Sequence, residues 1–166
     1  MSEPFFNENP QLKQGYLYAV RLLAASKKSE QELSKRLLEK GYLKESVEGV
    51  IERLKNKGIL SDQKLVHETV QWSMEAKRYG KRRIFMDLKR RGIASKEIAN
   101  ALESYPKSKE KEVASELAQN RWVKFKNIDP KKRKKRVYDF LLNRGFDYEL
   151  SRELISKLEQ KNDENS

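Results

Sequence analysis

The hexapeptide LLEKGY at residues 37–42 returns as LKRRGI at residues 88–93 and as LLNRGF at residues 141–146. Each copy has Leu, two variable residues, a basic residue, Gly and a large apolar residue. The three glycines lie 51 and then 53 positions apart, and the apolar residues around them keep the same register. This spacing predicts a tandem repeat, an architecture that offers a long surface to a long partner.

The residues on either side of each glycine predict two helices per copy. Apolar residues stand eight and four positions before it and nine, ten and thirteen positions after it, which is the spacing of one helix face. Glycine suits left-handed backbone just past a helix end, and the preceding base suits the negative end of the helix dipole. Each hexapeptide is therefore predicted to end a helix. We expect Gly92→Val to distort the middle repeat, because a β-branched residue tolerates the left-handed region poorly.

Signals for helix starts complete each unit. Ser29 and Glu32 have capping-box spacing, Ser95 can cap a helix that runs through Leu102, and Asp129 precedes a proline at the first helical position. Another helical stretch lies ahead of each pair, at residues 16–25, 65–79 and 113–122. The repeating unit is therefore predicted to be three helices.

Composition agrees with an all-α fold, since the chain is 37% hydrophobic and 37% charged and shows no strand-like alternation. A repeat of about 50 residues buries only a small core, so it depends on packing against its neighbours for stability. We expect three tandem three-helix repeats in an elongated, curved array, right-handed or solenoid-like. The expected organisation is a flexible N-terminal tail at residues 1–14, repeats at 15–61, 62–108 and 109–158, and a polar tail at 159–166.

Several classes of protein are disfavoured. The first residues lack a basic start followed by an apolar core, so they do not resemble a secretory signal. No apolar stretch approaches the roughly 20 residues of a membrane span, and there is no cysteine for disulfides or thiolate metal sites. We expect a soluble, cytoplasmic protein without a cofactor. The sequence has no coiled-coil heptad pattern, and we expect a monomer.

Charge is the second informative feature. The chain has 37 Lys and Arg against 25 Asp and Glu, a formal charge of +12 and a pI near 9.7, which is typical of proteins with anionic partners. The bases concentrate in the middle and last repeats, and the block at residues 131–136 opposes the dipole of the helix it begins. This block is interpreted as a binding site for phosphates or acidic side chains; the alternative interpretation is a helix face that only contacts water. The candidate binding residues are Lys77, Arg78, Lys81, Arg82, Arg83, Lys89, Arg90, Arg91, Lys131, Lys132, Arg133, Lys134, Lys135 and Arg136.

Neighbouring residues have two interpretations each. Gly80 could let the backbone and Lys81 approach a phosphate closely, or it could serve a plain turn between helices. Four aromatic residues could stack on bases as in single-strand binders, although core packing is the preferred interpretation. These residues are Trp72, Tyr79, Trp122 and Phe125.

Motifs for catalysis are missing. His67 is the only histidine, and no phosphate-binding loop or H-E-x-x-H motif is present. Acidic residues are scattered through helices, where pairing with nearby bases is the ordinary explanation. We therefore interpret the chain as a binding protein with no catalytic, cofactor or metal residues.

Four phrases in order carry a resemblance to a known family. SEQEL at residues 29–33, GILSD at 58–62, RYGKRRI at 78–84 and LKRRGI at 88–93 together resemble the RecX family of recombinase regulators. The resemblance covers about residues 16–158. It implies three tandem three-helix repeats, no catalysis, and binding in the groove of the RecA filament on single-stranded DNA. Inhibition of ATP hydrolysis and strand exchange is implied as well, and with it a role in recombination and DNA repair.

Two functional hypotheses follow. In the first, the candidate basic residues bind RecA on single-stranded DNA, and double-stranded DNA is a further candidate partner. Exchange of Lys132, Arg133 and Lys135 for Glu is then expected to abolish binding and to leave helicity intact. In the alternative, the chain is a general DNA-binding protein without a recombinase partner, with steep salt dependence and no added affinity for a filament. An enzyme built from scattered carboxylates would instead show turnover without another protein.

Overall fold

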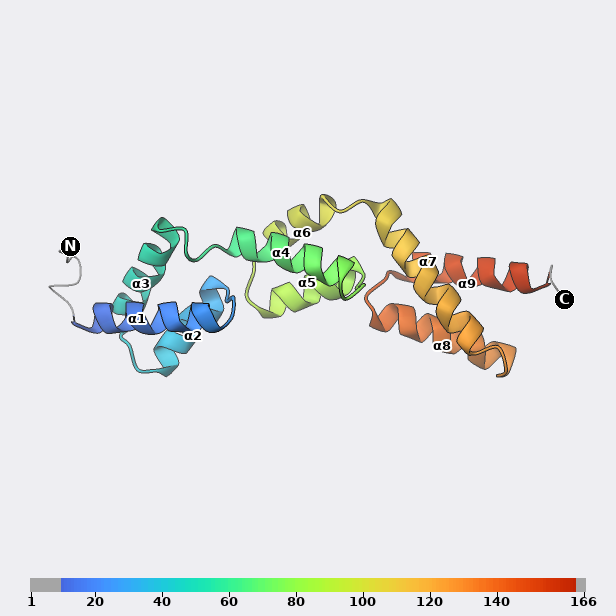
Figure 1. The fold of residues 1–166 in the computed structure, drawn as a ribbon, viewed down its shortest axis with the longest axis horizontal. Helices are drawn as coiled ribbons and strands as arrows, with labels where there is room; N and C mark the ends of the chain where they lie inside the picture. Colours follow the sequence, from blue (N-terminus) through green and yellow to red (C-terminus); the bar gives the residue numbers. More distant parts are fainter. Residues whose placement is uncertain (1–9, 164–166) are drawn as a thin grey trace. The chain divides into compact units, whose positions relative to one another are not determined.

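The computed structural model describes residues 10–163, and this part of the chain is all-α. It forms nine helices and no strand (Figure 1). They are α1 (Pro10–Ala25), α2 (Glu30–Glu39), α3 (Lys44–Asn56), α4 (Asp62–Glu75), α5 (Lys81–Arg90), α6 (Ser95–Glu103), α7 (Lys107–Lys124), α8 (Pro130–Asn143) and α9 (Tyr148–Asp163). The predicted helical class and the three-helix repeat are confirmed.

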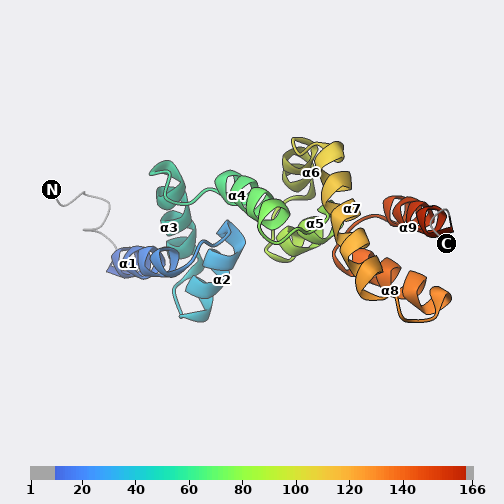
Figure 2. The ribbon, with the colours of Figure 1, turned by 45° about the vertical axis from the view of Figure 1, so that its right-hand side comes forward.

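The described residues divide into two compact units. The first contains the residues through His67 together with Leu88–Glu97, and the second contains Glu68–Asp87 and the residues from Ile98 onward. Within the first, α1 packs against α2 and α3; within the second, α7 packs against α8 and α9, as the two views of the ribbon show (Figures 1 and 2). Helices α4, α5 and α6 each contain residues of both units, so the middle repeat is divided between them.

The three hexapeptides form the same helix stop. Gly41, Gly92 and Gly145 have φ values of +97°, +84° and +89°. In the third copy the Gly145 N–H donates to the Leu142 carbonyl and the Phe146 N–H donates to the Leu141 carbonyl, at 2.9 and 3.1 Å. The equivalent pair of bonds occurs in the other two copies. This is the Schellman arrangement, which satisfies carbonyls that a helix end leaves open. The prediction of a left-handed glycine is confirmed at all three positions.

Two of the predicted helix starts are also confirmed. The Ser29 side chain accepts a hydrogen bond from the Glu32 N–H, and the Glu32 carboxylate accepts one from the Ser29 N–H, which completes a capping box. The Asp129 carboxylate accepts from the Lys132 N–H, with proline at the first position of α8. Ser95 instead lies within α6, and its hydroxyl accepts a hydrogen bond from the Lys89 ammonium at 2.9 Å.

The repeated apolar positions form the cores. Residues eight and four positions before each glycine are at most 1% exposed: Leu33, Leu37, Ile84, Leu88, Val137 and Leu141. In the first unit Leu33 and Leu37 pack with Val50 and Leu54 of α3. In the second unit Val137 and Leu141 pack with residues of α7 and α9 that include Trp122 and Ile155. Burying such a side chain contributes about 1.5–3 kcal/mol to the free energy of unfolding. The repeated apolar positions are therefore the residues that stabilise each core.

Helix boundaries differ from the sequence predictions at several places; α7, for example, covers Lys107–Lys124 where the sequence predicts a helix at residues 113–122. The helix expected to reach Tyr79 ends at Glu75, and Arg78 adopts a left-handed φ of +56°, so the chain turns before α5. Helix α1 begins at Pro10, inside the expected N-terminal tail, because Leu12 is buried in the first core. Helix α9 continues to Asp163, and Glu159 forms an ion pair with Lys134. The rest of the two expected tails lies outside the described residues.

The glycine of the middle hexapeptide carries a constraint that Gly41 lacks. A Cβ at Gly92 would lie 2.7 Å from the Gln31 Cβ, whereas a Cβ at Gly41 meets no heavy atom within 4 Å. We expect Gly41→Ala to lower the free energy of unfolding by about 1–2 kcal/mol, the cost of left-handed backbone alone. Gly92→Ala should cost more, because helix α2 must also move. Urea denaturation followed by circular dichroism measures both, and equal losses would contradict the contact with α2.

Candidate nucleic-acid interface

The densest basic block lies at the start of α8. Asp129 caps this helix and Pro130 occupies its first position, so residues 131–136 fill the next two turns. Cations here oppose the positive end of the helix dipole, which makes a facing anion favourable. The six bases therefore lower the stability of α8, and a phosphate or a carboxylate of a partner would offset that loss.

The six bases of this block have different surroundings. Arg133 donates to the Trp122 carbonyl at 2.9 Å and lies over the Trp122 ring, 4.1 Å from its centroid, so it belongs to the packing of α7 on α8. Lys134 and Lys135 form ion pairs with carboxylates of α9 and α8 at 2.9 and 2.7 Å. Lys131 and Lys132 are exposed, and within residues 10–163 their ammonium groups have no hydrogen bond or ion pair. Arg136 is exposed too, and its guanidinium lies 5.5 Å from the centroid of the Phe125 ring, which leaves its charge in place. These two lysines and Arg136 are the most available cations of the block.

The start of α5 is a packing site. Gly80 is buried, and a Cβ there would lie 2.4 Å from the backbone of Gly145. The Gly80 N–H donates to the Arg144 carbonyl at 2.9 Å, and the Arg82 N–H donates to the Gly145 carbonyl at 3.1 Å. The Lys81 ammonium is held by the Tyr105 carbonyl at 2.8 Å. The missing side chain of Gly80 thus allows close backbone approach between α5 and the end of α8, which favours the turn between helices over the phosphate contact.

The bases around this turn lie on the surface of the second unit. Arg78 forms an ion pair with Glu116. Arg82 lies over the ring of Tyr148 at 5.0 Å, and Arg83 lies over the ring of Tyr79 at 4.1 Å. The carboxylate of Glu116 neutralises Arg78, whereas an aromatic ring leaves the charge of a guanidinium intact. Arg82 therefore keeps its positive charge for a partner, whereas Arg83 also forms a long, exposed ion pair with Asp87 that a phosphate can replace at little cost.

The aromatic residues divide between core and surface. Trp122 is 6% exposed and belongs to the core of the second unit, and Tyr79 and Phe125 are half-buried. Trp72 is 56% exposed, and the Lys77 ammonium lies 4.2 Å from its ring centroid. Core packing, the preferred interpretation from the sequence, is confirmed for Trp122 and is wrong for Trp72.

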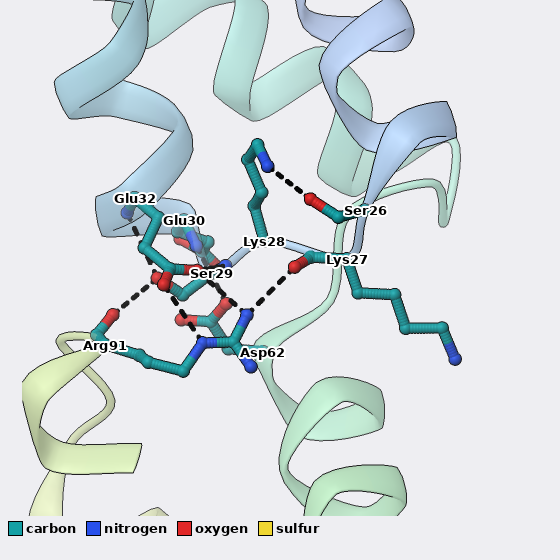
Figure 3. A network of polar contacts seen from close by, with 8 residues as sticks. All are labelled: Ser26, Lys27, Lys28, Ser29, Glu30, Glu32, Asp62 and Arg91. Carbon is teal, nitrogen blue, oxygen red and sulfur yellow. Dashed lines mark hydrogen bonds and ion pairs between the residues drawn. The ribbon is translucent and has the colours of Figure 1, made fainter. Parts of the chain in front are cut away.

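At the other end of α5, Arg91 joins a polar network of the first unit. Its guanidinium donates twice to the Glu32 carboxylate, at 3.0 and 2.9 Å, and once to the Lys27 carbonyl at 2.9 Å (Figure 3). The Ser29 hydroxyl donates to the Arg91 carbonyl. A bidentate pair of this kind is directional and stronger than a single ion pair. Arg91 thus fastens the end of α5 to the capped start of α2.

Asp62 extends this network at the start of α4. Its carboxylate accepts a hydrogen bond from the Glu30 N–H at 2.8 Å (Figure 3), and the Glu30 carboxylate pairs with Lys55 at 2.8 Å. Burial raises the pKa of the Asp62 carboxyl, and the hydrogen bond from Glu30 opposes this effect only in part. The first turn of α2 is therefore held from outside the helix by Asp62 of α4 and by Arg91 after α5.

The second unit has an equivalent junction built with other groups. Gly80 precedes Gly92 by the same number of residues as Ser29 precedes Gly41. Gly80 donates its N–H to the Arg144 carbonyl, as the Ser29 hydroxyl does to Arg91. The Arg144 guanidinium donates to the Lys77 carbonyl at 2.6 Å. Sequence reasoning missed the junction role of Arg144, although its position before the third repeated glycine matches that of Arg91.

The only histidine of the sequence lies on α4. His67 is exposed, and within the part of the chain that the structure describes no three His, Asp or Glu side chains are grouped as metal ligands. None of the described helices combines the length and the apolarity needed to cross a membrane.

These features define a class, that of tandem helical-repeat proteins in which each unit has three helices. Family models for the first, second and third three-helix domains of RecX match residues 16–54, 61–102 and 109–155. The chain belongs to the RecX family.

Similar proteins agree with this assignment. The chain is 33% identical to the regulatory protein RecX of Chlorobium limicola, over 86% of this chain and 88% of that protein. It is 30% identical to the RecX of Pelodictyon phaeoclathratiforme, over 80% and 81%. The crystal structure of RecX from Lactobacillus salivarius has the same fold, with a TM-score of 0.82 and 19% identity over 91% of this chain and 98% of that one. Since the Chlorobium and Pelodictyon relatives are named regulatory proteins, membership supports a regulatory role.

Glu32 and Arg91 make the stability of the first unit depend on pH. Burial by itself raises the pKa of Glu32, but the hydrogen bonds from Arg91 and Ser29 and the charges of Arg91 and Lys28 bring it below its ordinary value of 4.5. A carboxyl with a lowered pKa in the folded state contributes stability above its unfolded pKa and loses it as the pH falls through the folded pKa. The first unit should therefore lose stability below about pH 4.5.

We expect Arg91→Met to lower the free energy of unfolding by about 1 kcal/mol at pH 7 and to flatten this acid dependence. Urea unfolding at several pH values between neutral and acid measures both effects. Lys89→Met is the matched control, because Lys89 lies on the same turn of α5 and bonds only to the Ser95 hydroxyl. An acid dependence in Arg91→Met as steep as in the parent would show that the pair does not set it.

Proposed function

We propose that this protein regulates homologous recombination and DNA repair by binding the RecA filament on single-stranded DNA and inhibiting its ATPase and strand-exchange activities. The protein acts without catalysis or a cofactor, as a cytoplasmic monomer. Membership of the RecX family, whose named members are regulatory proteins, is the observation that carries this proposal. The net charge of +12 supports a polyanionic partner.

Not all fourteen candidate bases support the binding surface equally. Arg78 and Arg91 have carboxylate partners, and Lys81 is half-buried with its ammonium on a backbone carbonyl. The exposed ion pairs of Lys134 and Lys135 are worth about 0–1 kcal/mol, so a phosphate can replace the carboxylate at little cost. The contribution to binding is therefore expected to be largest at residues 131–136, which we call the α8 block. The ammonium groups of Lys131 and Lys132 can bind a phosphate there without first breaking an ion pair.

The alternative is a general DNA-binding protein without a recombinase partner. The exposed cations beside Trp72 favour this possibility too, because they could contact the phosphates of any single-stranded DNA. The two hypotheses differ in what the filament adds. A filament regulator acts at ratios far below saturation of the DNA, and a general DNA-binding protein acts only when it competes for phosphates.

ATP hydrolysis by RecA on single-stranded DNA tests the proposal. RecA is titrated with this protein well below one copy per RecA monomer, at a salt concentration at which binding to naked DNA is weak. Progressive inhibition at these ratios supports a filament regulator. Inhibition that begins only when the protein coats the DNA would favour the alternative function.

The α8 block can be tested without disturbing the fold. The change Lys131→Glu with Lys132→Glu should reduce inhibition at least tenfold and lower the salt dependence of DNA binding by about two counterions. Because carboxylates suit a helix N-terminus, the helix should be more stable in this variant. The triple exchange with Arg133 expected from the sequence is unsuitable, since Arg133 is bonded to the Trp122 carbonyl.

The matched control is Lys35→Glu with Lys44→Glu. It changes the net charge equally at two exposed lysines of the first unit whose ion pairs are with neighbouring helical carboxylates. This control should inhibit RecA to within about twofold of the parent. Equal losses in both variants would mean that only net charge matters and that α8 has no special role.

A further inference from the structure

The second unit contains a tryptophan that its core does not use. Trp72 lies on α4 and is 56% exposed, whereas the other tryptophan of the chain, Trp122, is 6% exposed. A large apolar side chain left in water forgoes the stabilisation that its burial would give. The Lys77 ammonium lies over the indole, 4.2 Å from the ring centroid. Trp72 therefore has surface available to a ligand, and a cation stands beside it.

Rings and cations alternate along the surface next to Trp72. The Lys77 ammonium also lies 5.6 Å from the centroid of Tyr79. The Tyr79 ring is in turn approached by the guanidinium of Arg83 at 4.1 Å and that of Arg144 at 5.5 Å. We call these five residues the Trp72 row. They come from α4, the segment after it, α5 and the end of α8, all within the second unit.

Backbone carbonyls hold the two arginines of the Trp72 row. Arg144 donates to the Lys77 carbonyl at 2.6 Å, and Arg83 donates to the Asn143 carbonyl at 3.0 Å. The Asp87 carboxylate approaches Arg83 at 3.9 Å on the exposed side of α5. A carbonyl orients a guanidinium without neutralising it. Arg144 therefore keeps its positive charge in a fixed position, the charge of Arg83 is only partly offset by a long, exposed ion pair with Asp87, and the Lys77 ammonium lies over the exposed Trp72 ring.

We propose that the Trp72 row binds single-stranded DNA, with a base stacked on Trp72 and neighbouring phosphates contacted by Lys77, Arg83 and Arg144. Tyr79, whose ring the three cations flank, holds them in place. The inference rests on the proposed function and deepens it, since it names a second contact with the strand besides the α8 block. Stacking of one base on an aromatic side chain contributes about 1–3 kcal/mol and tolerates any sequence.

A single strand fits the Trp72 row better than the other anionic partners do. The faces of paired bases are covered by their neighbours in a duplex, so an exposed indole has nothing to stack on there. An acidic protein could use the three cations, but it would need an apolar group of its own to cover Trp72. An unpaired nucleotide supplies both a flat ring and a phosphate.

Fluorine NMR of protein labelled with 5-fluorotryptophan tests the inference on the intact chain. Two resonances are expected, one from each tryptophan, and Trp72→Leu assigns them. Titration with a dT oligonucleotide of about 20 nucleotides at low salt should shift the Trp72 resonance and leave that of Trp122 in place. A duplex of the same length should shift it much less.

Affinity for the same oligonucleotide, measured by fluorescence anisotropy, gives the energetic test. Trp72→Leu should bind about 5- to 150-fold more weakly, the loss of one stacked base, and Trp72→Phe should recover most of the affinity. Tyr148→Leu is the matched control, because Tyr148 is 51% exposed and has an arginine over its ring but lies outside the Trp72 row. This control should bind within about twofold of the parent.

Three results would overturn the inference. The first is an unshifted Trp72 resonance together with parental affinity of Trp72→Leu. The second is an equal shift with duplex DNA, which would indicate phosphate contact alone. The third is normal oligonucleotide binding by Trp72→Leu with loss of RecA inhibition, which would assign the Trp72 row to a protein partner. Failure of the parent protein to inhibit RecA would instead refute the proposed function, whatever the oligonucleotide results.

Discussion

A left-handed glycine at the end of the second helix of each repeat is the constraint on which the structure depends. It closes the helix through the Schellman bonds, and at Gly92 and Gly145 the absence of a side chain also lets another helix approach. In the first unit this neighbour is α2, and in the second unit it is the start of α5. One residue type thus ends a helix and forms a contact between successive repeats, which explains why the hexapeptide recurs so regularly.

The same constraint decides which positive charges are free. The arginines just before Gly92 and Gly145 donate their side-chain hydrogen bonds within these contacts, Arg91 mainly to Glu32 and Arg144 to the Lys77 carbonyl. A carboxylate partner removes most of the charge of Arg91, whereas a carbonyl leaves that of Arg144 in place. The density of bases along the sequence therefore overstates the charge available in the middle repeat. In the last repeat the α8 block retains its charge, because the ammonium groups of Lys131 and Lys132 have no hydrogen bond or ion pair within residues 10–163.

The two proposed contacts with DNA would use different physics. The α8 block offers cations at a helix start, where they reduce stability and where an anion would offset that cost. The Trp72 row offers a flat apolar surface beside Lys77 and two arginines that hydrogen bonds to backbone carbonyls hold in place. Charge attracts any polyanion from a distance, and stacking selects unpaired bases at contact. Together they would suit a strand held extended by another protein.

The sequence by itself determined the helical class, the repeat, the left-handed glycines and the capping of α2 and α8. These features depend on a few neighbouring residues and on backbone preferences that act locally. It also indicated RecX membership, which the family models show. Only the tertiary structure decided that Gly80 meets Gly145, that Arg91 pairs with Glu32, and that Trp72 is exposed while Trp122 is buried. Each of these depends on which distant segments meet, and residue spacing along one helix carries no information about that.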